Sequence, residues 1–161
     1  MQNKADKMEC KYCKIVSAPR DIVYQTKYWK AKLSDDQTYL GRCFILSVRH
    51  AENLSELNDE EWLDFSTLVK TLETGIKKAF GAEMFNWECL MNNAYNVRKP
   101  IAHTHWHMRP RYRKPVEILG VKFTDKDFGR RYDRRKDRIL PRAVREEIIS
   151  KMKENMPQKP G

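Results

Sequence analysis

Three of the four histidines of this chain, His103, His105 and His107, occupy alternate positions. Alternate residues of a β-strand share one face, about 7 Å apart at each step, so this spacing predicts a row of imidazoles whose intervening neighbours face a core. Each imidazole needs partners for two ring nitrogens, which makes such a row costly as ordinary packing. Imidazole is also a nucleophile and a proton carrier near neutral pH. The row therefore predicts attack on phosphorus through a phosphoimidazole that water can cleave.

Cys10 and Cys13 form a C-x-x-C pair near the N-terminus. Two thiolates at this spacing supply half of a tetrahedral metal site, which two further ligands would complete. The pair alone is equally compatible with a redox dithiol or with coincidence, so these alternatives stay open at this point. Cys43 and Cys89 lie in apolar runs and are predicted to be small core residues.

Several segments with strand-like composition must surround these side chains. Strands are expected at residues 22–25, 28–33, 42–48, 85–92 and 103–108, the last one ending at Arg109-Pro110. The polar residues 34–37 predict a turn between two of these strands. Residues 93–102 and 111–138 are expected to be loops, and the second of them is strongly basic.

Two helices are expected as well. Asn58 is the predicted N-cap of the first, and Glu61 completes a capping-box pattern three residues later. Gly81 predicts its C-terminal end. Pro141 fits the first turn of a second helix, whose apolar stripe consists of Val144, Ile148, Ile149 and Met152.

The length and charge of the chain limit the classes of function. A chain of 161 residues predicts one compact domain, or two at most. Its net charge of +10 favours anionic partners, either nucleotides, nucleic acid or an anionic membrane surface. The longest apolar run, residues 43–48, has the length of a strand, so no transmembrane helix is expected. Residues 1–9 lack an apolar signal core, and we expect an intracellular, cytoplasmic protein.

The segment His103-Thr-His105-Trp-His107-Met-Arg-Pro110 resembles the signature of the histidine triad (HIT) superfamily, in which three histidines alternate with apolar residues. The resemblance covers roughly residues 8–112 and includes elements in the order and spacing of the family. These elements are the C-x-x-C pair, Gly41-Arg42-Cys43-Phe44-Ile45-Leu46 leading to Arg49-His50, the helix that follows, and Leu90-Met91-Asn92-Asn93.

The resemblance implies an α+β, HIT-like fold: a mostly antiparallel sheet with a long helix and a C-terminal helix, usually paired into a homodimer. It also implies a domain organisation. Residues 1–9 would be a disordered leader and residues 10–112 the HIT domain. Residues 113–155 would be a basic extension with a helix packed on the same domain, and residues 156–161 a tail.

The resemblance implies a mechanism for this cluster. The middle histidine of the family attacks the α-phosphorus of a nucleotide, and that role falls on His105. A nucleotidyl-histidine forms and is resolved by water or another acceptor. His107 would hydrogen-bond the phosphate oxygens and stabilise developing charge, and would help to protonate the leaving group. Asn93 matches the family asparagine close to the phosphates.

The resemblance also implies a metal. In members with the C-x-x-C pair, zinc is bound by the two cysteines and two histidines, which here are Cys10, Cys13, His50 and His103. Four protein ligands leave no open position, so this zinc would be structural and would not activate water. The alternative is a metal-free or partly oxidised pair, with His103 orienting its neighbours.

The sequence departs from the family in two places near the expected phosphate site. Arg98 and Lys99 stand where many members have a glycine-glutamine pair that contacts the scissile phosphate. A cation there would hold phosphate electrostatically, or Lys99 would be a solvated loop charge. The ribose-contacting aspartate of the family is displaced or absent, and Asp35 is the candidate, with an ordinary polar turn as the alternative.

The basic residues after the triad are the remaining distinctive feature. Arg109 and Arg111 follow the histidines directly and are candidates for extra phosphate contacts. The dense run at residues 130–136 is either a solvated surface or a site for polyphosphate or nucleic acid.

The leading hypothesis is a hydrolase or nucleotidyltransferase that cleaves a dinucleoside polyphosphate or nucleoside phosphoramidate of a purine nucleoside. The alternatives are a non-catalytic nucleotide-binding adaptor and a nucleic-acid-binding protein that uses the basic C-terminal region.

Overall fold

The protein, seen in a computed structural model, is described over residues 9–18, 20–132 and 137–157. Its main sheet has five antiparallel strands in the order β1-β2-β3-β5-β4. The strands are β1 (Ile22–Gln25), β2 (Trp29–Leu33), β3 (Cys43–Ser47), β4 (Met84–Glu88) and β5 (His105–Arg111). The expected α+β architecture is confirmed. Of the expected leader, residues 1–8 lie outside the described part of the chain.

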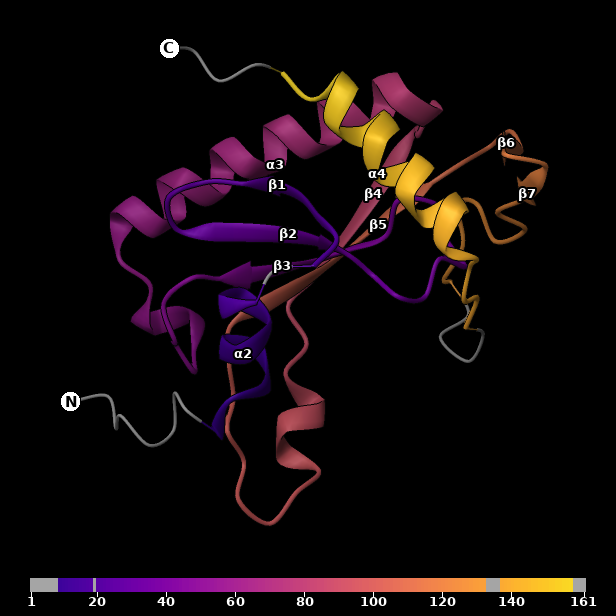
Figure 1. Ribbon diagram of the computed structural model, residues 1–161. Helices are drawn as coiled ribbons and strands as arrows, with labels where there is room; N and C mark the ends of the chain where they lie inside the picture. Colours follow the sequence, from indigo (N-terminus) through magenta and orange to yellow (C-terminus); the bar gives the residue numbers. More distant parts are fainter. Residues whose placement is uncertain (1–8, 19, 133–136, 158–161) are drawn as a thin grey trace.

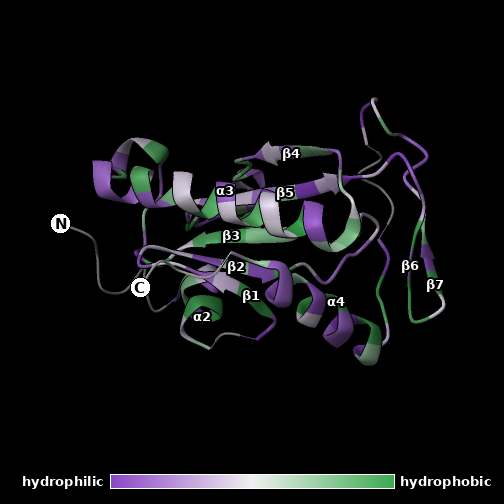
Figure 2. Ribbon diagram, turned by 90° about the horizontal axis from the view of Figure 1, so that it is seen from above, coloured by the Kyte–Doolittle hydropathy of each residue, from purple (hydrophilic) through white to green (hydrophobic). Residues whose placement is uncertain are grey.

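The strand register gives the sheet one apolar face. Ala31, Ile45 and Trp106 are neighbours across three strands and therefore share this face. Helix α3 (Asp59–Phe80) covers it, and Figure 1 shows α3 running along one side of the sheet. Figure 2 shows β3 as a mostly apolar strand in the middle of the sheet. The residues of α3 that are fully buried against this face are Leu68, Leu72 and Ile76.

Helix α3 begins and ends where the sequence predicts. The side chain of Asn58 accepts a hydrogen bond from the Glu61 amide at 2.9 Å, and the Glu61 carboxylate accepts one from the Asn58 amide. Gly81 ends the helix in the left-handed conformation, with φ of 74°. A short 3-10 helix, η1 (Leu54–Glu56), precedes α3. No helix in the described ranges combines the length and apolar character needed to cross a membrane.

The opposite face of the sheet carries the histidines. His107 pairs with Phe44 and His105 with Leu46, so these four side chains share one face. Helix α2 (Lys11–Ser17) and the 3-10 helix η2 (Asn92–Tyr95) approach this face. Figure 1 shows α2 on the side of the sheet away from α3. The predicted alternation therefore holds for His105 and His107, whereas His103 lies before the strand.

Strand β5 differs from the expected strand at residues 103–108. It begins at His105 and continues through Pro110 to Arg111, so the prediction that Arg109-Pro110 ends it is wrong. Pairing with β3 stops at Met108, whereas pairing with β4 continues to Arg111. The Arg111 carbonyl accepts a hydrogen bond from the Glu83 amide on the β4 side. Backbone polar groups of successive strand residues point in opposite directions, so the nitrogen of Pro110 points to the β3 side, where pairing with β3 has already stopped. Proline is tolerated there because no ladder hydrogen bond is lost.

The segment between β5 and the last helix, expected to be loop-rich, also contains two short strands. Strands β6 (Val116–Ile118) and β7 (Val121–Phe123) form a hairpin. Its turn, Leu119-Gly120, has φ angles of 47° and 76°, as the preferred two-residue hairpin turn requires. Strands of three residues are too short to leave a periodic signal in the sequence. Strand β4 is also shorter than expected and ends at Glu88.

Helix α4 (Arg142–Asn155) packs on α3 and β1. Pro141 is its N-cap residue and lies one position before the first turn that the sequence predicts for it. Met156, the first residue of the expected tail, is only 8% exposed. A Cβ on Gly75 of α3 would lie 2.5 Å from the Met156 sulfur, which shows that the absence of a side chain at Gly75 admits Met156. Residues 158–161 lie outside the described part.

Candidate functional site

The start of α2, the segment after β3 and the segment just before β5 bring four metal-ligating side chains together. Cys10, Cys13, His50 and His103 are all buried, and their ligand atoms lie within 4.8 Å of one another. The Nδ1 atom of His103 lies 3.5 Å from the Sγ atoms of both cysteines and 3.3 Å from Nδ1 of His50. The structure therefore assembles the full predicted ligand set from three segments that are far apart in the sequence.

These distances fit a tetrahedral zinc site. With Zn–S near 2.3 Å and Zn–N near 2.0 Å, a tetrahedron places sulfur and nitrogen about 3.5 Å apart and two nitrogens about 3.3 Å apart. The observed S···N distances are 3.4 and 3.5 Å and the N···N distance is 3.3 Å. The Cys13 amide also donates to Sγ of Cys10. The donor set and its spacing are therefore those that zinc prefers.

The second nitrogen of His103 is held by the protein. Nε2 lies 3.0 Å from the Ser47 carbonyl oxygen and 3.0 Å from its hydroxyl, so Nε2–H donates to the carbonyl and Nδ1 is free to bind a metal. Burial, followed by the neighbouring His50 and His105, lowers the pKa of His103 to about 4, against a smaller opposing effect of the Ser47 carbonyl. The ring is thus neutral, as a metal ligand must be.

The ring of His105 is fixed in the tautomer that a nucleophile needs. Its Nδ1 lies 2.8 Å from the backbone carbonyl of His103 and donates a hydrogen bond to it. Nε2 therefore carries the lone pair. Burial lowers the pKa of His105, and its hydrogen bond to His103 opposes this shift. A neutral imidazole with a fixed lone pair is suited to nucleophilic attack.

Tyr12 is a site residue that the sequence analysis missed. Its ring stacks on His105 with centroids 4.4 Å apart, and its hydroxyl lies 3.3 Å from Nε2. Burial and then the charge of Cys10 raise the pKa of Tyr12 above 10.0, so the hydroxyl is protonated and donates to Nε2. Its position between Cys10 and Cys13 was the available signal, because the two cysteines lie against His103 and so bring the start of α2 beside the triad.

A cavity of about 270 Å³, the triad cavity, opens beside His105 and His107. Its walls come from α2, from the histidine face of the sheet, from the turn after β2 and from η2. Ile15, Phe44 and Leu46 give it an apolar part, while Lys11, Lys32 and Arg42 give it cations. An apolar pocket with a few convergent polar groups is the usual form of a small-ligand site.

The structure brings some of the other predicted residues to this cavity. Asn93 and Asp35 both line it, and the Asp35 carboxylate lies 3.5 Å from Lys32. Arg98 and Lys99 are exposed and do not line it. Arg109 lies beyond His107, is 5% exposed and forms an ion pair with Glu88 at 3.0 Å.

His107 lies between His105 and Arg109 along β5. Its ring is 5.2 Å from that of His105 and contacts Phe44 edge-on at 4.9 Å. Burial lowers its pKa to about 4, with further lowering by His105, Arg109 and Arg42. Its Nδ1 is buried and has no hydrogen-bond partner among the described residues. His107 thus brings an unsatisfied nitrogen to the wall of the triad cavity.

The chain resembles known proteins in sequence and in fold. The HIT domain model matches residues 16–114. An uncharacterized HIT-like protein of Methanocaldococcus jannaschii is 29% identical over 112 residues, which cover 68% of this chain and 84% of that protein.

Two solved structures share the fold. A hypothetical histidine triad nucleotide-binding protein of Sulfolobus tokodaii is 21% identical with a TM-score of 0.67, covering 91% of each chain. A zinc-bound histidine triad family protein of Mycobacterium smegmatis is 17% identical with a TM-score of 0.59, covering 92% of this chain and 96% of that one. The expected HIT-like fold is confirmed. Because the family model matches more than half of the chain, this protein belongs to the HIT domain family.

Proposed function

We propose that the protein binds a purine nucleotide derivative in the triad cavity and cleaves it at the α-phosphorus, as a hydrolase or nucleotidyltransferase. The observation that carries this proposal is the state of His105. Its Nδ1–H is committed to the His103 carbonyl at 2.8 Å, which leaves the lone pair on Nε2 at the cavity wall. The nucleotide-binding protein of Sulfolobus tokodaii, which shares the fold, supports a nucleotide as the ligand.

The chemical step follows from this arrangement. The Nε2 lone pair of His105 forms a bond to the α-phosphorus, and the bond from phosphorus to the leaving group breaks, with its electron pair going to that group. Water or another acceptor then attacks the phosphorus and releases His105. His107 and Asn93, which line the same cavity, bind the phosphate oxygens and stabilise the charge that develops on them.

We also propose that Cys10, Cys13, His50 and His103 hold a structural zinc ion. The tetrahedral spacing of their ligand atoms supports this proposal, as does the zinc-bound relative of Mycobacterium smegmatis. When bound, the ion would join α2 to the strand of the nucleophile. A homodimer and a cytoplasmic location remain predictions from the resemblance and from the sequence.

Replacing His105 tests the proposed reaction. His105→Ala and His105→Asn should reduce turnover of diadenosine tetraphosphate and of adenosine phosphoramidate to background, while AMP binding by calorimetry changes by less than about tenfold. A control is Leu63→Ala, an exposed residue of α3 that does not line the triad cavity and should keep full turnover. Full activity in His105→Ala would refute the mechanism. Tight AMP binding with no turnover in the unmodified protein would favour the adaptor alternative.

A further inference from the structure

A second cavity, here named the extension cavity, adjoins the triad cavity on the far side of His107. It has a volume of about 300 Å³. The two cavities share Arg42, Asn93 and His107, which therefore form the boundary between them. His105 lines only the triad cavity. The remaining walls of the extension cavity include Asp36, Tyr39, Arg109, Tyr132 and Asp137.

The segment after the HIT match builds part of this cavity. Tyr132 and Asp137 lie beyond residue 114, where the family model ends. The Tyr132 ring covers Arg109, with the guanidinium carbon 4.2 Å from the ring centroid, and it meets Tyr39 edge-on at 5.9 Å. The extension therefore places an aromatic ring and a buried cation at one wall.

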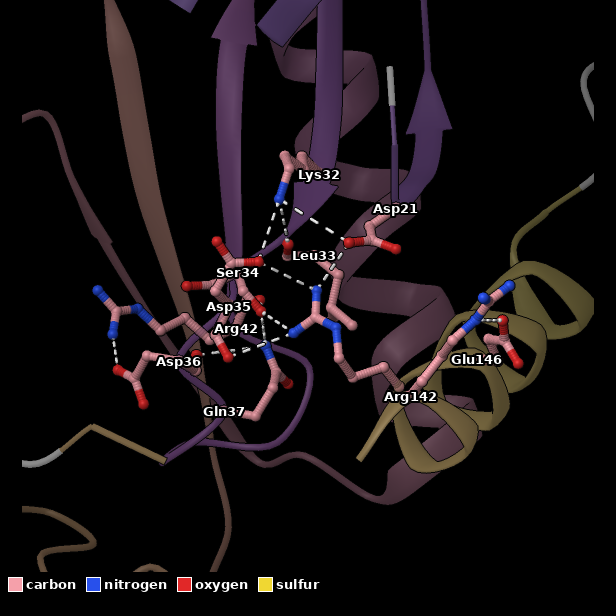
Figure 3. Close-up of polar contacts among 11 residues, drawn as sticks. Asp21, Lys32, Leu33, Ser34, Asp35, Asp36, Gln37, Arg42, Arg142 and Glu146 are labelled. Carbon is pink, nitrogen blue, oxygen red and sulfur yellow. Dashed lines mark hydrogen bonds and ion pairs between the residues drawn. The ribbon is translucent and has the colours of Figure 1, made fainter. Parts of the chain in front are cut away.

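Backbone contacts attach this segment to the turn that separates β2 from β3. The Arg138 amide donates to the Asp36 carboxylate at 2.9 Å, and the Gln37 amide donates to the Arg138 carbonyl at 2.8 Å. Asp36 in turn forms an ion pair with Arg42 (Figure 3). Asp36 thus connects the extension to a residue at the boundary of the two cavities.

Helix α4 holds the same turn from the other side. Arg145 donates to the backbone carbonyl of Ser34 at 2.9 Å and to the Asp21 carboxylate at 2.8 Å. Figure 3 shows Asp21, Ser34 and Asp35 gathered at this point, next to Asp36 and Arg42. The wall of the extension cavity is therefore fixed by charged groups on both sides.

The boundary between the cavities has nitrogen atoms suited to phosphate. Nε of Arg42 and Nδ1 of His107 are buried and have no hydrogen-bond partner within the described ranges. Arg109 stands on the other side of His107, and its guanidinium and that of Arg42 each lower the pKa of His107. Burial, and then the charge of Arg42, lower the pKa of Arg109. A phosphate chain between the two guanidinium groups would relieve this repulsion.

From these observations we propose that the extension cavity binds the leaving group, and that this group is a phosphate chain ending in a second nucleoside. The inference rests on the proposed function and deepens it, because it selects dinucleoside polyphosphates over phosphoramidates. Arg42 and Arg109 bind the phosphates, and Tyr132 contacts the second base. Stacking of a base on an aromatic side chain is sequence-tolerant and contributes to affinity.

The positions of the cavities match the geometry of displacement at phosphorus. Attack and departure occur roughly in line, so a nucleophile in the triad cavity requires the leaving group on the opposite side of the phosphorus. Nε2 of His105 forms the N–P bond, and the P–O bond to the β-phosphate breaks, with its electron pair remaining on the departing phosphate oxygen. Arg42 and Arg109 stabilise the resulting anion, and the nucleotidyl group stays on His105.

The charge around His107 supports a phosphate leaving group over an amine. An amine departs only with an added proton, whereas a phosphate chain departs as an anion. Burial and then His105 are the main causes that disfavour a protonated His107, and the guanidinium groups of Arg109 and Arg42, which add to them, would favour a departing anion. The charges at the boundary and the positions of the two cavities thus both favour a phosphate leaving group.

The test compares two substrates with the same transferred group. We would measure kcat/KM for diadenosine tetraphosphate and for adenosine phosphoramidate in the unmodified protein, in Tyr132→Ala and in Tyr132→Phe. The unmodified protein should prefer the tetraphosphate. Tyr132→Ala should reduce this preference about tenfold, within the roughly 1–3 kcal/mol of a base-stacking contact, and Tyr132→Phe should keep it. The matched control is Leu119→Ala, an exposed apolar residue of the extension that lines neither cavity.

The outcomes separate this inference from the proposed function. Suppose that the unmodified protein turns over the phosphoramidate and that Tyr132→Ala lowers kcat/KM by the same factor for both substrates. This result would overturn the inference and leave the proposed function intact. No turnover of either substrate by the unmodified protein would overturn the proposed function. A second measurement needs no variant: with AMP saturating the unmodified protein, calorimetry should detect one further ADP site per chain. Absence of ADP binding under these conditions would also overturn the inference.

Discussion

Two contacts act on opposite nitrogens of His105 and together define its state. The His103 carbonyl accepts from Nδ1 at 2.8 Å, while the Tyr12 hydroxyl donates to Nε2 at 3.3 Å. The first contact orients the His105 ring, and the second occupies the lone pair on Nε2. His105 is only 4% exposed, so a substrate reaches Nε2 only after the Tyr12 hydroxyl has moved.

Removing the Tyr12 hydroxyl should therefore expose the nucleophile. In Tyr12→Phe, we expect His105 to react with diethyl pyrocarbonate several-fold faster, since the lost hydrogen bond is worth about 0.5–1.5 kcal/mol. Peptide mapping by mass spectrometry would give the rate at His105, with the exposed Tyr95→Phe as the control. An unchanged rate at His105 would show that the hydroxyl does not protect Nε2.

At the scale of elements, helix α2 and its N-cap supply two of the four clustered ligand side chains. The helix has seven residues, and isolated helices of that length are not stable in water. Cys13 lies within it and Cys10 is its N-cap residue. Metal binding would therefore hold both α2 and Tyr12 against β5.

Loss of one ligand should release this element. Cys13→Ser should lower the zinc content from one ion per chain to none, measured by native mass spectrometry, and should lower the thermal midpoint, because the binding energy of structural zinc is folding energy. Cys89→Ser, whose residue lies outside the ligand set, should keep one ion. Retention of zinc by Cys13→Ser would disprove the predicted site.

The elements differ in how well the sequence predicts them. Helix α3 carries its own end signals at Asn58 and Gly81, so its limits are local and predictable. The extension of β5 through Pro110 is not, because a proline is tolerated only where a neighbouring strand has ended. Where β3 ends relative to β5 is set by the strand register, and the residues around Pro110 carry no signal of it.

The candidate site is likewise predictable from the sequence only in part. The ligand set follows from family spacing, and the structure brings all four side chains together. Tyr12 and the extension cavity were missed, because they arise when α2 and the extension pack against β5. Arg111 was a candidate for phosphate contact, yet the fold uses it in a buried ion pair. Which arginines face a ligand and which face a carboxylate depends on distant segments, and one sequence does not reveal it.

At the scale of the whole molecule, the buried pair of Arg111 and Asp125 joins the sheet to the extension. Nε of Arg111 lies 2.6 Å from the Asp125 carboxylate, and the two side chains are 1% and 2% exposed. Arg111 also donates to Asn86 of β4 and to the Arg130 carbonyl. One guanidinium thus contacts β4 and two parts of the extension.

Breaking this pair should destabilise the molecule strongly. Arg111→Ala should lower the free energy of unfolding by about 3–5 kcal/mol, because it leaves a buried carboxylate without a partner. The exposed pair of Arg113 and Glu83 provides the control, and Arg113→Ala should cost no more than about 1 kcal/mol. Urea unfolding of the two variants gives both values. Similar losses would contradict the structural role of Arg111.

The central claim is that His105 becomes covalently nucleotidylated, and a covalent trap tests it most directly. The protein would be mixed with α-labelled diadenosine tetraphosphate, quenched at alkaline pH to preserve phosphohistidine, and mapped by mass spectrometry. We expect an adenylyl group on His105 that is absent from His105→Ala. Turnover without any adduct on His105, or an adduct on another residue that persists in His105→Ala, would contradict it.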